Sequence, residues 1–197
     1  MGIDINNLSI EEFSKLFPIE IVPYNSKWPV IFEKEKSLLQ ETLSESIALR
    51  IEHFGGTSIP GLSSKPTIDI IMEIPQLNER LRKWIISKME LIDYIPLWRV
   101  SDKFSHMMFA KGYFASGFSG QTFHVHMDVK KSSMWDRLYF RNFLRENPET
   151  MKAYDTLKQK LADQHKYNRD AYNESKTDFI LEITRKAKVE AEKKDKE

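Results

Sequence analysis

The spacing of apolar residues along the chain predicts a sheet with helices packed against it. Apolar residues recur every three or four positions between residues 26 and 43, and again over residues 77–89, which predicts two amphipathic helices. Residues 67–74 form a β-branched apolar run between Pro66 and Pro75, a pattern typical of a buried central strand.

The remaining segments predict further strands and a helical C-terminal part. Ser9 and Glu12 have capping-box spacing, which predicts a short helix that Pro18 ends. Strands are expected at residues 49–54, 92–98, 105–111 and 122–129, and helices at 134–145, 149–164 and 175–190. This order predicts an α/β or α+β fold, in which a sheet is packed by helices.

Composition fits one folded domain and gives no strong nucleic-acid signal. Hydrophobic residues make up 41% of the 197 residues, which is enough for a core, and the net charge is only +1. The sequence has no cysteine, which excludes disulfides, thiolate metal sites and a cysteine nucleophile. Because we find no secretory pattern and no long apolar run, we expect a cytoplasmic protein without membrane contact.

The first candidate site is a glycine turn after the strand predicted at residues 49–54. Gly55, Gly56, Thr57 and Ser58 would let a ligand approach the backbone, where free N–H groups and hydroxyls favour phosphate oxygens. A tight β-turn with a capping hydroxyl explains the same four residues, and on local sequence alone it is the stronger interpretation.

The second candidate is a carboxylate within the predicted central strand. Asp69 is costly to bury unless it is paired or binds a metal ion. Glu73 shares its strand face but is about 13 Å away at roughly 3.3 Å per residue, too far to bind the same ion. Pairing with turn amides or with Lys65 is the structural alternative.

The third candidate is a polar strand face formed by His124, His126 and Asp128. Histidine and aspartate together suit transition metals, and aspartate alone suits magnesium. The alternative is a polar, solvent-facing side of a sheet.

The stretch RIEHFGGTSIPGLSSKPTIDI, residues 50–70, resembles the signature of the GrpB family, a bacterial group similar to nucleotidyltransferases. Further similar segments extend the resemblance over residues 19–187. It leaves residues 1–18 as an N-terminal helical extension and 188–197 as a charged tail. The resemblance implies a nucleotidyltransferase-like mixed sheet with a helical C-terminal part.

The resemblance also implies roles for the candidate residues. The turn from Gly55 to Ser58 would hold nucleotide phosphates, and Asp69 would be the first acid of a divalent metal site, with magnesium as the expected ion. A second acid is expected at position 71, where this chain has Ile71. Either the metal site is rebuilt from Asp69, His124 and His126, with Asp128 as a later acid, or transfer is lost and ligand binding is kept.

Five basic residues occupy positions that the resemblance covers, in a chain that is otherwise close to neutral. Arginine and lysine suit polyphosphate recognition, although each one taken singly is more simply a solvated charge. They are Lys65, Lys111, Arg141, Lys158 and Lys176.

Three hypotheses follow. In the first, the protein transfers a nucleotidyl group from an NTP to an unknown acceptor, with Asp69, Lys111 and Lys176 as catalytic residues. In the second, which Ile71 favours, it binds a nucleotide or another phosphorylated small molecule without turnover. In the third, its charged C-terminal helix binds a protein partner, because segments similar to GrpB occur fused to dephospho-coenzyme A kinase.

Overall fold

The computed structural model describes residues 5–97, 106–114 and 116–194. In these residues five strands form one sheet, in the order β1-β2-β5-β4-β3. The β2–β5 pair is parallel and the other pairs are antiparallel, so the sheet is mixed. The strands are β1 (Arg50–Phe54), β2 (Thr67–Glu73), β3 (Ile95–Pro96), β4 (Met107–Phe114) and β5 (Gly117–Asp128).

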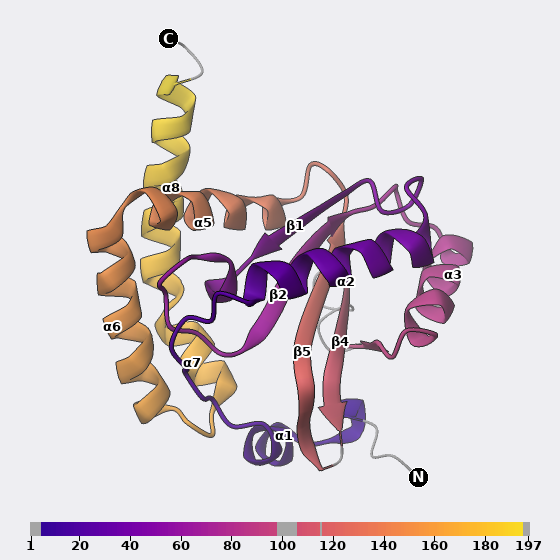
Figure 1. Cartoon of the computed structure of the whole chain (residues 1–197), viewed down its shortest axis with the longest axis horizontal. Helices are drawn as coiled ribbons and strands as arrows, with labels where there is room; N and C mark the ends of the chain where they lie inside the picture. Colours follow the sequence, from indigo (N-terminus) through magenta and orange to yellow (C-terminus); the bar gives the residue numbers. More distant parts are fainter. Residues whose placement is uncertain (1–4, 98–105, 115, 195–197) are drawn as a thin grey trace.

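Helices cover both faces of the sheet. In Figure 1, α2 crosses in front of the sheet, α3 lies beside it, and the helices after β5 gather at the opposite side. The α-helices are α1 (Ile10–Leu16), α2 (Trp28–Leu43), α3 (Glu79–Glu90), α5 (Asp136–Glu146), α6 (Pro148–Gln164), α7 (Arg169–Ser175) and α8 (Thr177–Lys194). The described residues also form the 3-10 helices η1 (Ile5–Asn7), η2 (Gly56–Ser58) and η3 (Ser133–Trp135).

The structure confirms the predicted fold class and most predicted elements, and it corrects some of their limits. The strand expected from residue 122 begins at Gly117, because β4 and β5 continue into a hairpin. The helix expected at 175–190 is α8, which begins at Thr177 and continues to Lys194, and a short helix that the sequence did not predict, α7, precedes it. The strand expected at 92–98 is reduced to β3, and residues 98 and 105 of the predicted strands lie outside the described part.

The main core lies between the sheet and helices α2 and α3. Alternate residues of β2 and β5 face it, as the period of a strand requires. The fully buried members include Leu39 of α2, Ile85 and Met89 of α3, Ile68, Ile70 and Met72 of β2, and Val125 and Met127 of β5.

The opposite face of the sheet is covered by two separate apolar clusters. Leu138 of α5 packs with Phe54 and Ile71, and Phe17 after α1 packs with Ala110 and Tyr113. The polar face of β2 and β5 lies between these clusters.

The long last helix, α8, packs on its own domain. Its Ile183 and Ala187 are buried against Phe143 of α5, and Lys188 forms an ion pair of 2.6 Å with Asp136. None of the described helices combines the length and the apolar character needed to cross a membrane.

Candidate functional site

One row of residues across the sheet defines the candidate site. Phe54, Asp69, His124 and Ala110 are consecutive register partners on β1, β2, β5 and β4. Phe54 and Ala110 belong to the two apolar clusters, so the polar pair of Asp69 and His124 lies between them.

Asp69, His124 and Tyr113 form a hydrogen-bonded chain. Nδ1 of His124 lies 3.3 Å from Oδ1 of Asp69, and its Nε2 lies 2.7 Å from the hydroxyl of Tyr113. An ionised carboxylate can only accept, so Nδ1 carries the imidazole proton and donates it, and Nε2 accepts from Tyr113. Both nitrogens of His124 are therefore engaged within the protein.

The pKa values of this chain agree with an ionised aspartate beside a neutral histidine. Burial raises the pKa of Asp69, but the hydrogen bond from His124 and the charge of Lys65 outweigh it and hold the pKa below its usual value. Burial lowers the pKa of His124, against the opposing effect of Asp69. Burial raises the pKa of Tyr113 to about 12.

The glycine turn brings the backbone directly against Asp69. Gly55 has φ of 70° and ψ of −176°, a region that only glycine populates readily, and a Cβ added there would overlap Oδ2 of Asp69. A Cβ at Gly56 would overlap the hydroxyl of Ser64. The absence of side chains at Gly55 and Gly56 therefore permits the close approach of the turn to Asp69 and to Ser64.

The two hydroxyls of the turn serve the turn itself. Thr57 is fully buried, and its hydroxyl donates to the carbonyl of Thr67 at 3.0 Å. The Ser58 hydroxyl donates to the carbonyl of Gly55 at 2.6 Å. In this structure they stabilise the turn, as the simpler interpretation of the sequence expects.

Lys65 and Lys176 share one aromatic ring beside Asp69. Their ammonium groups lie 5.6 Å and 4.5 Å from the ring centroid of Tyr172 on α7. Burial lowers the pKa of Lys176 to about 8, against the effect of Asp69, and the charges of Arg137 and Arg169 lower it further. Burial also takes the pKa of Lys65 well below its usual value, and the charge of Lys176 adds to this effect.

Lys158 of α6 lies behind the glycine turn. Its ammonium donates to the carbonyl of Ser63, lies 3.9 Å from Asp155, and would be 3.6 Å from a Cβ at Gly56. The residue is 3% exposed, and burial lowers its pKa to about 7. Lys158 thus supports the turn from within the protein.

Lys111 and Arg141 are not brought to Asp69. Lys111 lies on the opposite face of the sheet, where its ammonium donates to buried Glu35 at 2.9 Å and lies over Phe123. Arg141 of α5 binds β1: its Nη1 donates to the carbonyl of His53 at 2.7 Å and to the carboxylate of Glu52 at 3.0 Å.

The donor set does not fit a two-metal site. Ile71, at the position expected for a second acid, is fully buried in the cluster with Phe54 and Leu138. Among the described residues, no three His, Cys, Asp or Glu side chains are placed to hold one metal ion. Asp128 lies four residues along β5 from His124, where its register partner on β2 is Glu73. Its carboxylate accepts hydrogen bonds from the Ser132 hydroxyl at 2.6 Å and from the Val129 amide at 2.7 Å.

His126 lies two residues further along β5 than His124, against the rings of Phe54 and His106. It is 7% exposed, its ring contacts Phe54 edge-on at 5.5 Å, and its Nδ1 has no hydrogen-bond partner in the structure. Burial lowers its pKa well below the usual value. His126 therefore lies next to the site as a neutral group.

The sequence did not single out Tyr113 or Arg169 as site residues. The charge of Arg169 lowers the pKa of Lys65, Lys176 and His124, which puts its guanidinium close to all three. Arg169 lies at the start of α7, one helical turn before Tyr172, and nothing in the neighbouring sequence indicates that it is close to the site. Tyr113 likewise follows a bulge in β4 that local spacing does not reveal.

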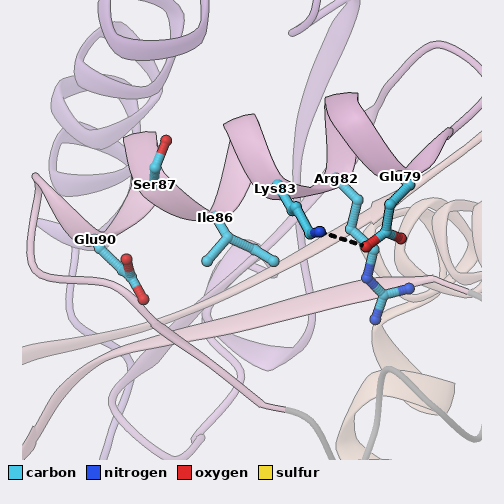
Figure 2. Close-up of a pocket in the computed structure, with 6 residues that line it drawn as sticks. All are labelled: Glu79, Arg82, Lys83, Ile86, Ser87 and Glu90. Carbon is cyan, nitrogen blue, oxygen red and sulfur yellow. Dashed lines mark ion pairs between the residues drawn. The ribbon is translucent and has the colours of Figure 1, made fainter.

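A hollow on the outer side of α3 is remote from this chemistry. Figure 2 shows the six residues that line it, all of which belong to α3. Among them, Lys83 forms an ion pair of 3.1 Å with Glu79. Because α3 packs on the main core, this hollow lies on the other side of the sheet from Asp69. We assign no function to it.

The fold and the site define a mixed α/β protein with a half-buried carboxylate between a glycine turn and a cluster of cations. The family model described as GrpB protein matches residues 18–186, and the chain belongs to this family. A solved structure, the conserved protein GrpB from Enterococcus faecalis, superposes with a TM-score of 0.72 and 30% identity. That match covers 85% of this chain and 96% of the other.

Relatives from several bacteria match over most of this chain. The UPF0157 protein PA4798 of Pseudomonas aeruginosa is 34% identical over 86% of this chain and 67% of its own length. YqkA of Bacillus subtilis is 33% identical over 86% of this chain, which spans only 47% of that protein. The glutamate-rich protein GrpB of Alkalihalophilus pseudofirmus is 30% identical over 83% of this chain and 92% of its own length.

Proposed function

We propose that this protein binds a phosphorylated small molecule, a nucleotide or another phosphometabolite, beside Asp69, without nucleotidyl transfer. The observation that carries the proposal is the crowding of cations at that place. Lys65 and Lys176 lie over the ring of Tyr172 close to Asp69. The charge of Arg169 lowers the pKa of both lysines, and the charge of Lys176 also lowers that of Lys65. A polyphosphate would relieve this repulsion, because it supplies the missing negative charge.

The net charge of the protein favours a small ligand over a nucleic acid. The net charge of the chain is +1, so the basic cluster is local and is not part of an extended basic surface. The glycine turn adds a backbone approach of the kind that phosphate groups use.

The nature of position 71 favours binding over transfer. The family resemblance puts a second acid there, but Ile71 fills an apolar cluster and His124 stands where β5 meets Asp69. Asp69 would then be the single carboxylate of the expected set, and two metal ions would lack their ligands.

Calorimetry with ATP and with inorganic triphosphate at pH 8 tests the proposal. A bound phosphate raises the pKa of a neighbouring ammonium, so binding should take up protons from the buffer. Lys176, with a pKa of about 8, should account for much of this uptake. The measured heat should therefore depend on the ionisation enthalpy of the buffer.

Two lysine variants make the test specific. Lys176→Met should weaken binding by roughly tenfold or more, since a charge-assisted bond to phosphate is lost, and should reduce the proton uptake. Lys83→Met, in an exposed ion pair on α3, should bind as the wild type does. Absence of binding or stabilisation by any nucleotide, triphosphate or phosphometabolite would overturn the proposal.

Nucleotidyl transfer is the second candidate, and the ionised carboxylate of Asp69 against the Gly55 backbone favours it. Its test is release of pyrophosphate from NTPs with magnesium and candidate acceptors. Under transfer, Asp69→Ala abolishes release. Under binding alone, no release occurs, and Asp69→Ala leaves triphosphate affinity unchanged or higher because a like charge is removed.

A further inference from the structure

The N-terminal segment of residues 8–17, which we name the strap, lies against the candidate site. It contains α1 and ends at Phe17, whose side chain is fully buried with Ala110 and Tyr113. The rings of Phe17 and Tyr113 are 5.0 Å apart, and those of Phe13 and Tyr113 are 6.2 Å apart. Figure 1 shows α1 at the end of the sheet where the β4–β5 hairpin lies.

The strap also holds Arg169. Nε of Arg169 donates to the carbonyl of Phe17 at 3.0 Å, and the guanidinium lies 5.4 Å from the ring centroid of Phe13. A cation over an aromatic face is attracted to it, and the hydrogen bond fixes the plane of the guanidinium. These two contacts span about 150 residues of sequence, so only the folded chain forms them.

Arg169 lies on the same side of α7 as the ring that the site lysines share. Residues three apart on a helix are neighbours on its surface, so Arg169 lies beside Tyr172. The ammonium groups of Lys65 and Lys176 lie over that ring. The strap therefore reaches the cation cluster through Arg169 and reaches Asp69 through Tyr113 and His124.

We infer that Arg169 binds a phosphate group of the ligand and that the strap holds it in position for this role. The inference rests on the proposed function and adds to it a binding residue and the segment that orients it. Nε of Arg169 is bound to the Phe17 carbonyl, and the guanidinium also donates to the Tyr113 hydroxyl. The remaining Nη N–H groups are then held in a fixed orientation toward phosphate oxygens. An arginine held this way loses less side-chain freedom when the ligand binds.

This arrangement couples strap docking to ligand binding. If docking of the strap raises ligand affinity by some factor, the ligand must stabilise the docked strap by the same factor. The family model begins at residue 18, so the strap adds to the site from outside the matched region.

Titration with inorganic triphosphate of the wild type, of Arg169→Gln, of a deletion of residues 1–17 and of the double variant tests the inference. Arg169→Gln and the deletion should each weaken binding by about tenfold. The double variant should be no weaker than Arg169→Gln alone, because the strap acts through Arg169. Thermal unfolding of each variant, without ligand, establishes that it is folded.

Milder variants keep the test valid if the deletion does not fold. Phe13→Leu removes the ring under the guanidinium while keeping an apolar side chain, and should weaken binding severalfold. Ile10→Ala, on the exposed side of α1, is the matched control and should bind as the wild type does. Hydrogen exchange of amides 13–17 should slow on adding triphosphate, by the factor that the deletion costs in affinity.

The outcomes separate the inference from the proposed function. Wild-type affinity in a folded deletion variant, or in Arg169→Gln, would overturn the inference while leaving phosphate binding intact. The inference would also be overturned if bound triphosphate left the hydrogen-exchange rates of the strap amides unchanged. A wild type that binds neither triphosphate nor nucleotide would refute the proposed function and the inference with it.

Discussion

The residues around Asp69 keep its half-buried carboxylate charged. A buried carboxylate is costly unless it is hydrogen-bonded or paired, and here His124 donates to it while Lys65 contributes an opposite charge. The same hydrogen bond orients His124, and Tyr113 occupies its second nitrogen. At this scale Asp69, His124 and Tyr113 form a chain in which each side chain fixes the orientation of the next.

Gly55→Ala is expected to destabilise the protein and to push the glycine turn, which the ligand would approach, away from Asp69. The alanine would adopt a strained backbone at φ of 70°, at a cost of about 1–3 kcal/mol, and its Cβ would overlap the Asp69 carboxylate. Urea unfolding measures the loss of stability, and triphosphate titration measures the loss of affinity.

Gly120→Ala separates strain from overlap. Gly120 has φ of 69°, but a Cβ there meets nothing within 4 Å. It should lose stability through strain alone and keep wild-type affinity. Equal affinity losses in the two variants would contradict the role of the Gly55 contact.

At the scale of elements, α5 is tied to β1 by one buried arginine. Arg141 is 9% exposed and connects the helix to the carbonyl of His53 and the carboxylate of Glu52. β1 leads directly into the glycine turn, so this tie also helps to fix the turn beside Asp69.

Arg141→Gln should lower the free energy of unfolding by about 1–3 kcal/mol, because the buried carbonyl of His53 loses its donor. The half-buried carboxylate of Glu52 loses one of its two arginine partners and keeps Arg50. Thermal or urea unfolding measures this loss. Lys194→Gln is the control: its ion pair with Glu146 joins α8 to α5 but is largely exposed, and should change stability by less than about 0.5 kcal/mol. Similar losses in both variants would argue against the buried tie.

For the whole molecule, the buried lysines link stability to pH. The folded pKa of Lys158 is about 7, well below about 10.4 in an unfolded chain, so the unfolded state binds more protons between these values. Stability should therefore rise as pH increases from about 7 towards 9. Lys176 and Lys65 act in the same direction, since their pKa values are also lowered.

Lys158→Met should flatten this dependence. Loss of one differential proton reduces the slope by up to about 1.4 kcal/mol per pH unit, measured by urea unfolding at pH 7, 8 and 9. Lys83→Met, at an exposed position of α3, should keep the wild-type slope. Parallel pH profiles for the wild type and Lys158→Met would contradict the buried, partly neutral state of Lys158.

Much of the fold was predictable from local pattern. The alternation in β2 and β5 and the helical spacing of α2 and α3 are properties of short segments, and burial of their apolar faces produces the main core. The glycine turn and Asp69 also stood out, because glycine pairs and a carboxylate in an apolar strand are visible without knowing their neighbours. The resemblance of residues 50–70 to GrpB then agreed with the family match.

The partners of the charged residues were decided only by the tertiary structure. The local sequence around Lys111 or Lys176 does not indicate its partner. Strand β4 brings Lys111 to Glu35 on one face of the sheet, and the α7–α8 junction brings Lys176 to Tyr172 on the other. Arg169 is held in place by a hydrogen bond to the carbonyl of Phe17, which lies 152 residues earlier in the sequence. Sequence by itself determined which segments form strands and helices and where polar groups interrupt them. Strand register and helix packing determined which of those groups meet, because contacts between distant segments leave no local periodicity in the chain.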